Sequence, residues 1–506
     1  MKKFITLFVL LAMIIASIPM SASALVVDEW EIAISGNEAT VIDYNGTCSA
    51  KMTMPTQIGG YKVVGLSAPI FSDNVEEIIF PEGFKYIKGR DTFTNLKNKL
   101  KKISLPQSLE ILESYFNDFT ELKEIYISGN IKEILGGVAW HPGQFTGCVN
   151  LTTVHLNAGL ETISESAFRD CINLKNIEIP NTVKTIDAQA FRNCDSLVSI
   201  TIPNSVINLG EKGGHRSSYS DAAFIDCDNL ESVIVGNGIN KFVAGSLSLG
   251  EFSNCPSLKS IHFENGLQAT ILSAAKIGAT GVLENNVLLK TIILPEGIKE
   301  IGSRFLNNIS NLENIVIPKS VNKFNGNPLC GEEEKPLPKL FIYGFAGSEA
   351  EKFASSAGFP FVDISIATPA NNKVLIDGKE VAFTAYTIGG NNYFKLRDIA
   401  SALNGTNKNF NVGWDGNNNA ITLNSKTSYI SVGGELVVNS NATATEPKIS
   451  NPKIFVDGKL TTFMAFNIAN NNYIKLRDLG EAFDFGVDWN NSTQTIEINT
   501  NKSYSK

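Results

Sequence analysis

The chain has 506 residues, of which 43% are hydrophobic, and a formal net charge of -8 at pH 7. This acidic balance, without a basic stripe, disfavours nucleic acid and polyanions as ligands, because both require clustered positive charge. Such a length also exceeds what one compact core usually covers, so several domains or a stack of repeats is expected.

Residues 1–24 predict a cleaved signal peptide. A basic start, Met1–Lys3, precedes an apolar run from Phe4 to Ile18 and then the small residues Ala22-Ser23-Ala24, the usual order of an export signal. The run is shorter than the roughly 20 residues of a membrane span. We therefore expect a mature chain that starts at Leu25, has no membrane span, and is secreted and extracellular, either free or associated with the cell surface.

Residues 25–70 predict an N-terminal cap. Two strand-like runs, Trp30–Ile34 and Thr40–Tyr44, flank Ser35-Gly36-Asn37, which is a hairpin signal. The open end of a repeat stack exposes apolar residues and needs such a cover.

A repeat of 23 residues dominates residues 71–367. Three landmark residue types recur at that spacing: Phe145, Phe168 and Phe191; Cys148, Cys171 and Cys194; Leu151, Leu174 and Leu197. Leu and Ile at i, i+3 and i+5 within a period in the twenties predict a leucine-rich repeat solenoid, in which each coil adds one strand to a parallel sheet.

Eleven strand triplets can be placed in this region. They are centred on Ile79, Ser104, Tyr126, His155, Glu178, Thr201, Ile234, His262, Ile293, Val316 and Ile342. Side chains alternate along a strand, so the outer positions of a triplet are predicted to face the core and the middle position to face outward. Insertions at 135–144, 210–222 and 268–282 are expected to form surface loops.

These marks resemble the BspA-type leucine-rich repeat family of bacterial secreted and surface proteins, over residues 25–365. Five full copies of the Phe-x-x-Cys-x-x-Leu triad start at Phe145, Phe168, Phe191, Phe224 and Phe252. Phe119 and Ile309 replace the cysteine in two flanking copies. The resemblance implies a solenoid fold but does not identify a ligand.

A different duplication follows the solenoid. The motif Asn-Tyr-x-Lys-Leu-Arg-Asp occurs at 392–398 and again at 472–478, an offset of 80 residues, and each copy is followed by a tryptophan, Trp414 or Trp489. Short strand signals surround one short helix signal in each copy. The sequence predicts two small α+β modules, 370–438 and 454–500, joined by a polar linker, 439–453.

The modules resemble the copper amine oxidase N-terminal-like, or stalk, domains that Gram-positive bacteria attach to secreted proteins. The name implies no copper here, because the four histidines, His141, His155, His215 and His262, all lie in the repeat region, and copper sites normally use imidazole. The motif itself could bind a ligand through its charged residues, although a local ion pair is the favoured interpretation. These residues are Lys395, Arg397 and Asp398, and in the second copy Lys475, Arg477 and Asp478.

No motif for catalysis, a metal or a cofactor is present, so the chain is predicted not to be an enzyme. Cys148 and His155 belong to one coil, but one is predicted to face the core and the other to face outward. Seven cysteines in an exported chain invite disulfides. We favour free thiols, since five of them occupy equivalent, parallel positions where apolar residues substitute.

The outward row of the predicted sheet is the candidate ligand surface, since solenoids commonly bind there. Its proposed binding residues are Tyr126, Trp140, His155, Glu178, Thr201, Ile234 and His262. Trp140 lies in an insertion beside Tyr126 and His155. Two alternatives stay open for it: it contributes to binding, or it folds back over the edge of its coil.

Two functions remain open. The first is an adhesin-like interaction protein whose solenoid binds an extracellular protein or glycan, with the C-terminal modules for display or attachment to the cell wall. The alternative is a cell-envelope carbohydrate-binding protein that acts through the C-terminal modules, with the solenoid as a spacer.

Overall fold

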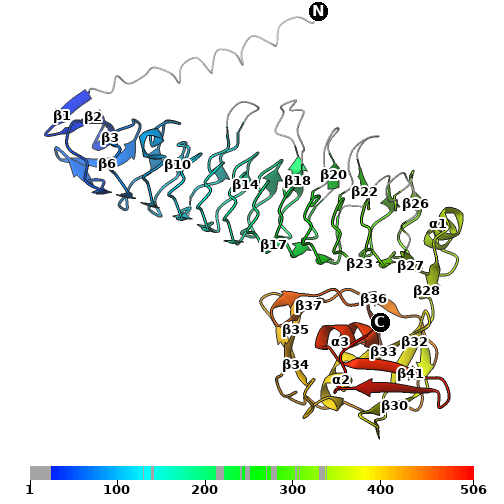
Figure 1. Ribbon diagram of the computed structural model, residues 1–506. Coiled ribbons are helices and arrows are strands. Elements are labelled where there is room, and N and C mark those ends of the chain that lie inside the picture. The colour runs from blue at the N-terminus through cyan, green and yellow to red at the C-terminus, as the bar shows by residue number, and fades with distance from the viewer. Residues whose placement is uncertain are drawn as a thin grey trace, which may run out of the picture.

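The computed structural model describes an elongated solenoid that is followed by a rounded C-terminal domain (Figure 1). The described residues are 24–128, 130–137, 142–211, 222–239, 242–244, 251–268, 271–274, 282–302, 305–306, 308–326, 328–329, 337 and 339–505. Residues 1–23 of the predicted signal peptide, Trp140, His141, His215, Cys330 and most residues of the three insertions taken together lie outside these ranges.

Each solenoid coil contributes one strand to each of two layers of parallel strands. The strands of the first layer, here called the front layer, are β4 (Lys51–Thr53), β7 (Glu77–Ile79), β9 (Lys102–Ser104), β11 (Glu124–Tyr126), β13 (Thr153–His155), β15 (Asn176–Ile177), β17 (Ser199–Ile202), β19 (Ser232–Val235), β21 (Ser260–Phe263), β23 (Thr291–Ile293), β25 (Asn314–Val316), β27 (Phe341–Gly344) and β28 (Phe361–Asp363). The predicted parallel repeat fold is therefore present.

The back layer is formed by the second strand of each coil. Its strands are β8 (Tyr86–Ile87), β10 (Ile111–Leu112), β12 (Glu133–Ile134), β14 (Thr162–Ile163), β16 (Thr185–Asp187), β18 (Asn208–Glu211), β20 (Phe242–Ala244), β22 (Ile271–Ala274), β24 (Glu300–Ile301) and β26 (Lys323–Phe324). A short 3-10 helix, η1 (Thr94–Leu96), lies between β8 and β9. The predicted insertion at 135–144 follows β12, and that at 210–222 begins at the end of β18. The insertion at 268–282, which was predicted to be a surface loop, contains β22, and this strand pairs with β20 and β24 in the back layer. The loop prediction was therefore wrong for Ile271–Ala274.

Both ends of the solenoid are covered. At the N-terminus, β2 (Trp30–Ser35) and β3 (Glu38–Tyr44) form the predicted hairpin, which β1 (Ala24–Val27), β5 (Gln57–Ile58) and β6 (Tyr61–Leu66) extend into the back layer. At the C-terminal end, helix α1 (Glu349–Ala357) lies between β27 and β28. Ser348 accepts a hydrogen bond from the Glu351 N–H at its start, and Gly358, with φ 78°, ends it, as helix caps commonly do.

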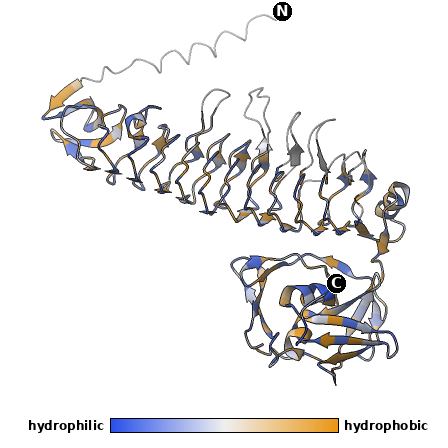
Figure 2. Ribbon diagram, viewed as in Figure 1, coloured by the Kyte–Doolittle hydropathy of each residue, from blue (hydrophilic) through white to orange (hydrophobic). Residues whose placement is uncertain are grey.

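The core of the solenoid is a ladder of stacked phenylalanines. Phe145 and Phe168 have ring centroids 5.3 Å apart, and Phe168 and Phe191 are 5.5 Å apart, with interplanar angles of 5° and 14°. This spacing is close to that of neighbouring strands, so equivalent rings meet face to face. Figure 2 shows apolar residues in the described coils along the whole stack.

The cysteine ladder lies beside the phenylalanines. Each thiol donates a hydrogen bond to the carbonyl oxygen of the phenylalanine at the start of the preceding triad, as from Cys148 to Phe116 (2.9 Å) and from Cys171 to Phe145 (3.2 Å). Burial raises the pKa of Cys148 to about 12. Contact with the Cys255 thiol raises the pKa of Cys227 well above its ordinary value. The thiols of Cys148, Cys171, Cys194 and Cys227, whose pKa values are all raised, are thus kept protonated.

We expect five or more of the seven cysteines to react as free thiols in guanidinium without reductant. They should react far more slowly in the native protein, because thiolate is the reactive form and burial suppresses it. Titration with a thiol-specific dye, with and without denaturant, checks this. Two or fewer reactive thiols in denaturant would show that the ladder is disulfide-bonded.

One strand triplet differs from the prediction. In β27, Ile342 pairs with Ile315 and faces the core, whereas Tyr343 pairs with Val316 and faces outward. The predicted triplet centre, Ile342, was therefore wrong by one residue. In this last coil no proline ends the strand and no Phe-x-x-Cys triad precedes it. The register is therefore unmarked in the sequence, and a shift of one residue exchanges the two faces of a strand.

The two C-terminal copies form one domain. Its elements are β29 (Thr368–Ala370), β30 (Lys373–Ile376), β31 (Lys379–Glu380), β32 (Ala385–Ile388), β33 (Asn391–Lys395), α2 (Leu396–Ala402), β34 (Phe410–Asp415), β35 (Ala420–Ser425), β36 (Lys448–Ser450), β37 (Lys453–Val456), β38 (Lys459–Leu460), β39 (Ala465–Ile468), β40 (Asn471–Lys475), α3 (Leu476–Phe483), β41 (Gly486–Asn490) and β42 (Thr495–Asn499).

The copies exchange strands. Strand β30 of the first copy pairs with β42 of the second, β37 of the second pairs with β35 of the first, and β33 pairs with β40 at the centre. The stretch 439–453, which was predicted to be a linker, contributes β36 to the central sheet. A copy of this size can bury too little apolar surface alone, which explains why the pair shares one core instead of forming two modules.

Candidate binding surfaces

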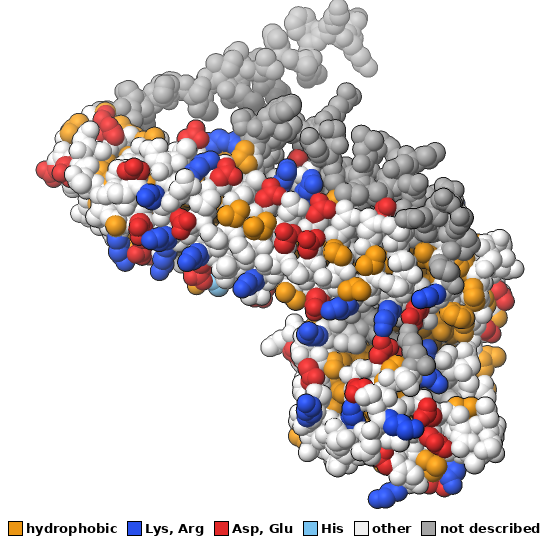
Figure 3. Space-filling view, viewed as in Figure 1, with side chains coloured by type: hydrophobic (Ala, Val, Ile, Leu, Met, Phe, Trp, Pro, Cys, Tyr) orange, Lys and Arg blue, Asp and Glu red, His pale blue; other side chains and the backbone are white. Residues whose placement is uncertain are grey.

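The C-terminal domain covers part of the front layer. Ile293, Val316 and Tyr343 face outward from the solenoid and pack with Tyr386, Tyr393 and Phe466 in a shared apolar cluster. Around this cluster, Lys453 pairs with Glu264 (2.7 Å) and Lys290 with Glu481 (2.6 Å). Figure 3 shows acidic and basic side chains meeting where the two parts join. The outward row is thus open from β7 to β17 and covered from β23 to β27.

The predicted binding residues are distributed over both parts of this row. Tyr126, His155, Glu178 and Thr201 are exposed, and Ile234 is half-buried. His262 is only 5% exposed, and the neighbouring Phe263 carbonyl accepts a hydrogen bond from Asn451 of the C-terminal domain (3.1 Å). His262 is therefore unavailable to a ligand in this arrangement. Trp140 lies outside the described residues.

Tyr126 and His155 form the most organised group in the open part. The register pairs them across β11 and β13, and their rings stack with centroids 4.0 Å apart at an interplanar angle of 5°. Tyr126 is 50% exposed. Two rings that are held rigidly at a surface offer contact area at little entropic cost, a property of binding hot spots.

Glu124 holds this pair in place, and the sequence analysis did not identify it. The Tyr126 hydroxyl donates to Glu124 Oε1 (3.0 Å), and His155 Nε2 lies 2.9 Å from the same oxygen. The hydrogen bond with His155 is the main reason that the pKa of Glu124 lies below its usual range. Residues two apart on a strand share a face, so the spacing of Glu124 and Tyr126 was the available signal.

Cys148 and His155 do not form a catalytic pair. Cys148 is fully buried with a raised pKa, whereas His155 is exposed on the front layer. Within the described ranges, no three His, Cys, Asp or Glu side chains lie where they could together hold a metal ion. Among the same residues, no helix is long and apolar enough to cross a membrane.

The full chain is expected to bind no copper stoichiometrically at micromolar concentration. The C-terminal domain has no histidine, and carboxylates suit harder cations than copper. Isothermal calorimetry of the mature protein with Cu²⁺, after removal of metals by a chelator, checks this. A stoichiometric exothermic transition would contradict it.

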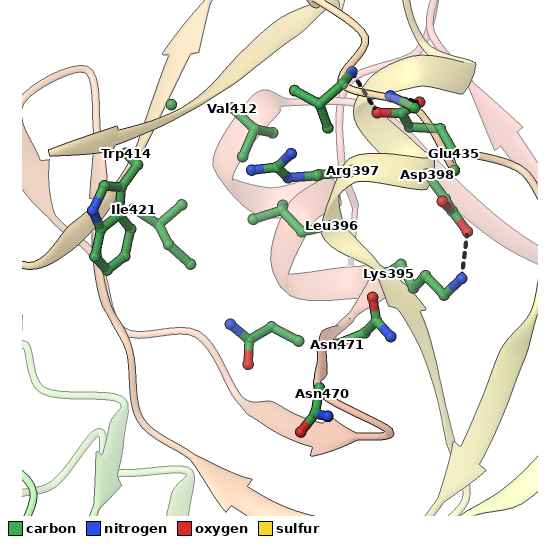
Figure 4. A pocket seen from close by; sticks show the side chains of 15 residues that line it. Lys395, Leu396, Arg397, Asp398, Val412, Trp414, Ile421, Glu435, Asn470 and Asn471 are labelled. Atoms are coloured by element: carbon green, nitrogen blue, oxygen red, sulfur yellow. Dashed lines mark hydrogen bonds and ion pairs between the residues drawn. The ribbon is translucent and has the colours of Figure 1, made fainter. Parts of the chain in front are cut away.

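The first charged motif lines a pocket of about 420 Å³ in the C-terminal domain (Figure 4). Asp398 is 1% exposed, and burial raises the pKa of its carboxyl group. Its Oδ1 accepts from the Leu436 N–H (3.1 Å), and Lys395 Nζ lies 4.0 Å from its Oδ2. The local ion pair that the sequence favoured is thus present between Lys395 and Asp398, although its N–O distance is long. Arg397 is exposed and pairs with no residue that the structure describes.

The second motif lies in a different environment. Lys475, Arg477 and Asp478 line a cleft of about 890 Å³ between the C-terminal domain and the front layer. Its solenoid side includes Ser199, Ser232 and Ser260, and the Lys290–Glu481 ion pair crosses it. The structure therefore places the two copies of one motif in two cavities and does not bring them together.

Comparison with known proteins identifies the repeat. The model of the BspA type leucine rich repeat region matches residues 61–138, 141–268 and 217–332, more than half of the chain. Similar solved structures include a leucine rich cell surface protein from Faecalibacterium prausnitzii (22% identity, 66% of this chain and 97% of that one, TM-score 0.32). A leucine-rich repeat protein from Bacteroides ovatus (20%, 67% and 100%, 0.33) and the pneumococcal vaccine antigen PcpA (18%, 68% and 98%, 0.33) are also similar.

No curated protein matches the chain. The matched family is typically secreted or located on the cell surface and is generally non-enzymatic. From its repeat, the chain belongs to the BspA-type leucine-rich repeat family.

Proposed function

We propose that this protein is an adhesin-like interaction protein of the bacterial surface or its surroundings, which binds a protein or glycan with the open part of its front layer. The proposal rests on one observation: the rings of Tyr126 and His155 stack on each other, and both bond to Glu124. The six strands from β7 to β17 at about 4.8 Å spacing offer a surface roughly 25 Å long. An extended peptide or a short glycan chain fits this length.

In this proposal the chain is exported after cleavage of residues 1–24 and needs no cofactor. The C-terminal domain, a fused pair of copper amine oxidase N-terminal-like modules, displays the solenoid or attaches it to the cell wall. The duplicated motif at 392–398 and 472–478 supports that assignment. The contact of the C-terminal domain with β23 to β27 fixes the direction in which the open surface points.

A second candidate function is carbohydrate binding by the C-terminal domain, with the solenoid as a spacer. The pocket beside Trp414, which is 61% exposed, favours it. An exposed indole face offers a large apolar surface, against which the C–H groups on one face of a sugar ring can pack.

Binding of the full chain to whole bacteria and to purified cell wall separates the two functions. If the solenoid acts, Tyr126→Ala with His155→Ala should weaken retention about tenfold, while Trp414→Ala has no effect. The reverse result would assign binding to the C-terminal domain. Retention that survives all three substitutions would contradict both proposals.

A further inference from the structure

The pocket of the first C-terminal copy contains three polar groups that have no partner among the described residues. The Arg397 guanidinium, the Asn470 amide and the Trp414 indole N–H form no hydrogen bond or ion pair with any residue that the structure describes. In Figure 4, Arg397 points across the pocket toward Val412 and Trp414, while Asn470 lies at the opposite edge. The groups come from three separate segments of the domain, and all border the same space.

The neighbouring acids do not neutralise Arg397. Glu435 accepts hydrogen bonds from its own loop: Tyr429 Oη (2.8 Å), Ser431 Oγ (2.7 Å) and the N–H groups of Val432 (2.9 Å) and Gly433 (3.1 Å). These bonds hold the pKa of Glu435 at about 2. Asp398 is buried behind the motif and faces Lys395. The guanidinium therefore remains available to an external anion.

The second copy provides an internal comparison. Its equivalent tryptophan, Trp489, is 38% exposed, and its indole N–H already donates to Asn491 Oδ1 (2.8 Å). Its equivalent arginine, Arg477, lies in the cleft beside the solenoid, apart from Trp489. Of the two copies, and among the residues that the structure describes, the first therefore combines an open indole with an unpaired arginine around one pocket, whereas the second does not.

From this arrangement we propose that the Trp414 pocket binds a saccharide carrying a carboxylate. The planar donor fork of an arginine matches a carboxylate, and the indole of Trp414 provides a stacking face for a sugar ring. The Asn470 amide can bond ring hydroxyls in either direction. A volume of about 420 Å³ lies in the usual range for small ligands.

The charge of the chain and of the pocket residues restricts the class of saccharide further. The chain carries a net charge of -8, and Asp398 and Glu435 lie beside the pocket, which disfavours a dense polyanion. We therefore infer a sugar with a single carboxylate. A uronic acid and the lactyl carboxylate of muramic acid share this chemistry. The inference rests on the second candidate function, carbohydrate binding by the C-terminal domain.

The test uses matched pairs of sugars: methyl glucuronide with methyl glucoside, and N-acetylmuramic acid with N-acetylglucosamine. The mature full chain is labelled with ¹⁵N-tryptophan, and its Trp414 indole signal is identified by its loss in Trp414→Phe. We expect the acidic sugar of at least one pair to shift this signal with a Kd about tenfold below that of its neutral partner. The pair that responds distinguishes a uronic acid from a wall sugar.

Arg397→Gln should remove the preference for the acidic sugar, while Arg477→Gln and Trp489→Phe should leave it unchanged. Equal affinity for acidic and neutral sugars, or a preference that survives Arg397→Gln, would refute carboxylate recognition yet keep carbohydrate binding. No response of Trp414 to any of the four sugars would refute both.

Discussion

Replacing Ile200 with aspartate is expected to unfold the middle coils of the solenoid. Ile200 is 3% exposed and pairs with Val233 in the front layer, inside the apolar stack. An unpaired buried carboxylate costs on the order of 3–5 kcal/mol. Each coil contacts only its neighbours, so the damage should be greatest from β15 to β19 and weaker at the caps.

Hydrogen exchange measured by mass spectrometry, together with the melting curve, checks this result. Thr201→Asp is the matched control, because Thr201 is the next residue along β17 but faces outward and is exposed. The control should change protection very little. If Ile200→Asp melts and exchanges like the parent, the assigned inward register is wrong.

The second large effect is expected at Val316. This side chain occupies an outward strand position, yet it is 1% exposed because the C-terminal domain covers it. Aspartate there places a charge in the shared apolar cluster, again at a cost of about 3 kcal/mol or more. Because Val316 points away from the solenoid core, we expect the C-terminal domain to separate while both parts remain folded.

Small-angle scattering should then show an increased radius of gyration, and exchange should rise at Tyr386 and Phe466 without loss of the solenoid core. Ser104→Asp is the control, since Ser104 has the outward position of β9 in the open part of the row. Unchanged scattering for Val316→Asp would mean that the apolar cluster does not hold the two parts together.

Most of the solenoid could be predicted because the spacing of the repeat along the chain determines which residues stack on adjacent coils. Equal spacing of Phe145, Phe168 and Phe191 along the chain becomes equal spacing of rings in space. The register error at Ile342 arose where those marks end.

The contact between the C-terminal domain and the front layer was only weakly indicated by the sequence. Middle positions of the triplets are polar at Ser104, Glu178 and Thr201, but apolar at Ile293 and Val316. An apolar residue at an outward position indicates a covered surface, although it does not reveal what covers it. The strand exchange between the C-terminal copies had no signal in the sequence, because a duplication predicts two similar units whether or not they share strands.

The position of Arg397 in its pocket was likewise not predictable from the sequence. The repeated motif identified it, but its twin Arg477 has the same sequence neighbours and lies in another cavity. The Tyr126–His155 pair was predictable from the repeat, since equivalent positions stack on adjacent coils. Glu124, which bonds to both rings, required the structure.

The most direct test of the central claim is the affinity of the Tyr126→Ala, His155→Ala double variant. The full chain is first applied to an array of glycans and extracellular-matrix proteins, and its strongest ligand is then titrated against the parent, the double variant and Trp414→Ala. We expect the double variant to bind about tenfold more weakly, equivalent to about 1.4 kcal/mol. Its melting temperature should stay within a few degrees of the parent's, and Trp414→Ala should bind like the parent. Unchanged affinity in the double variant would contradict binding by the open part of the front layer.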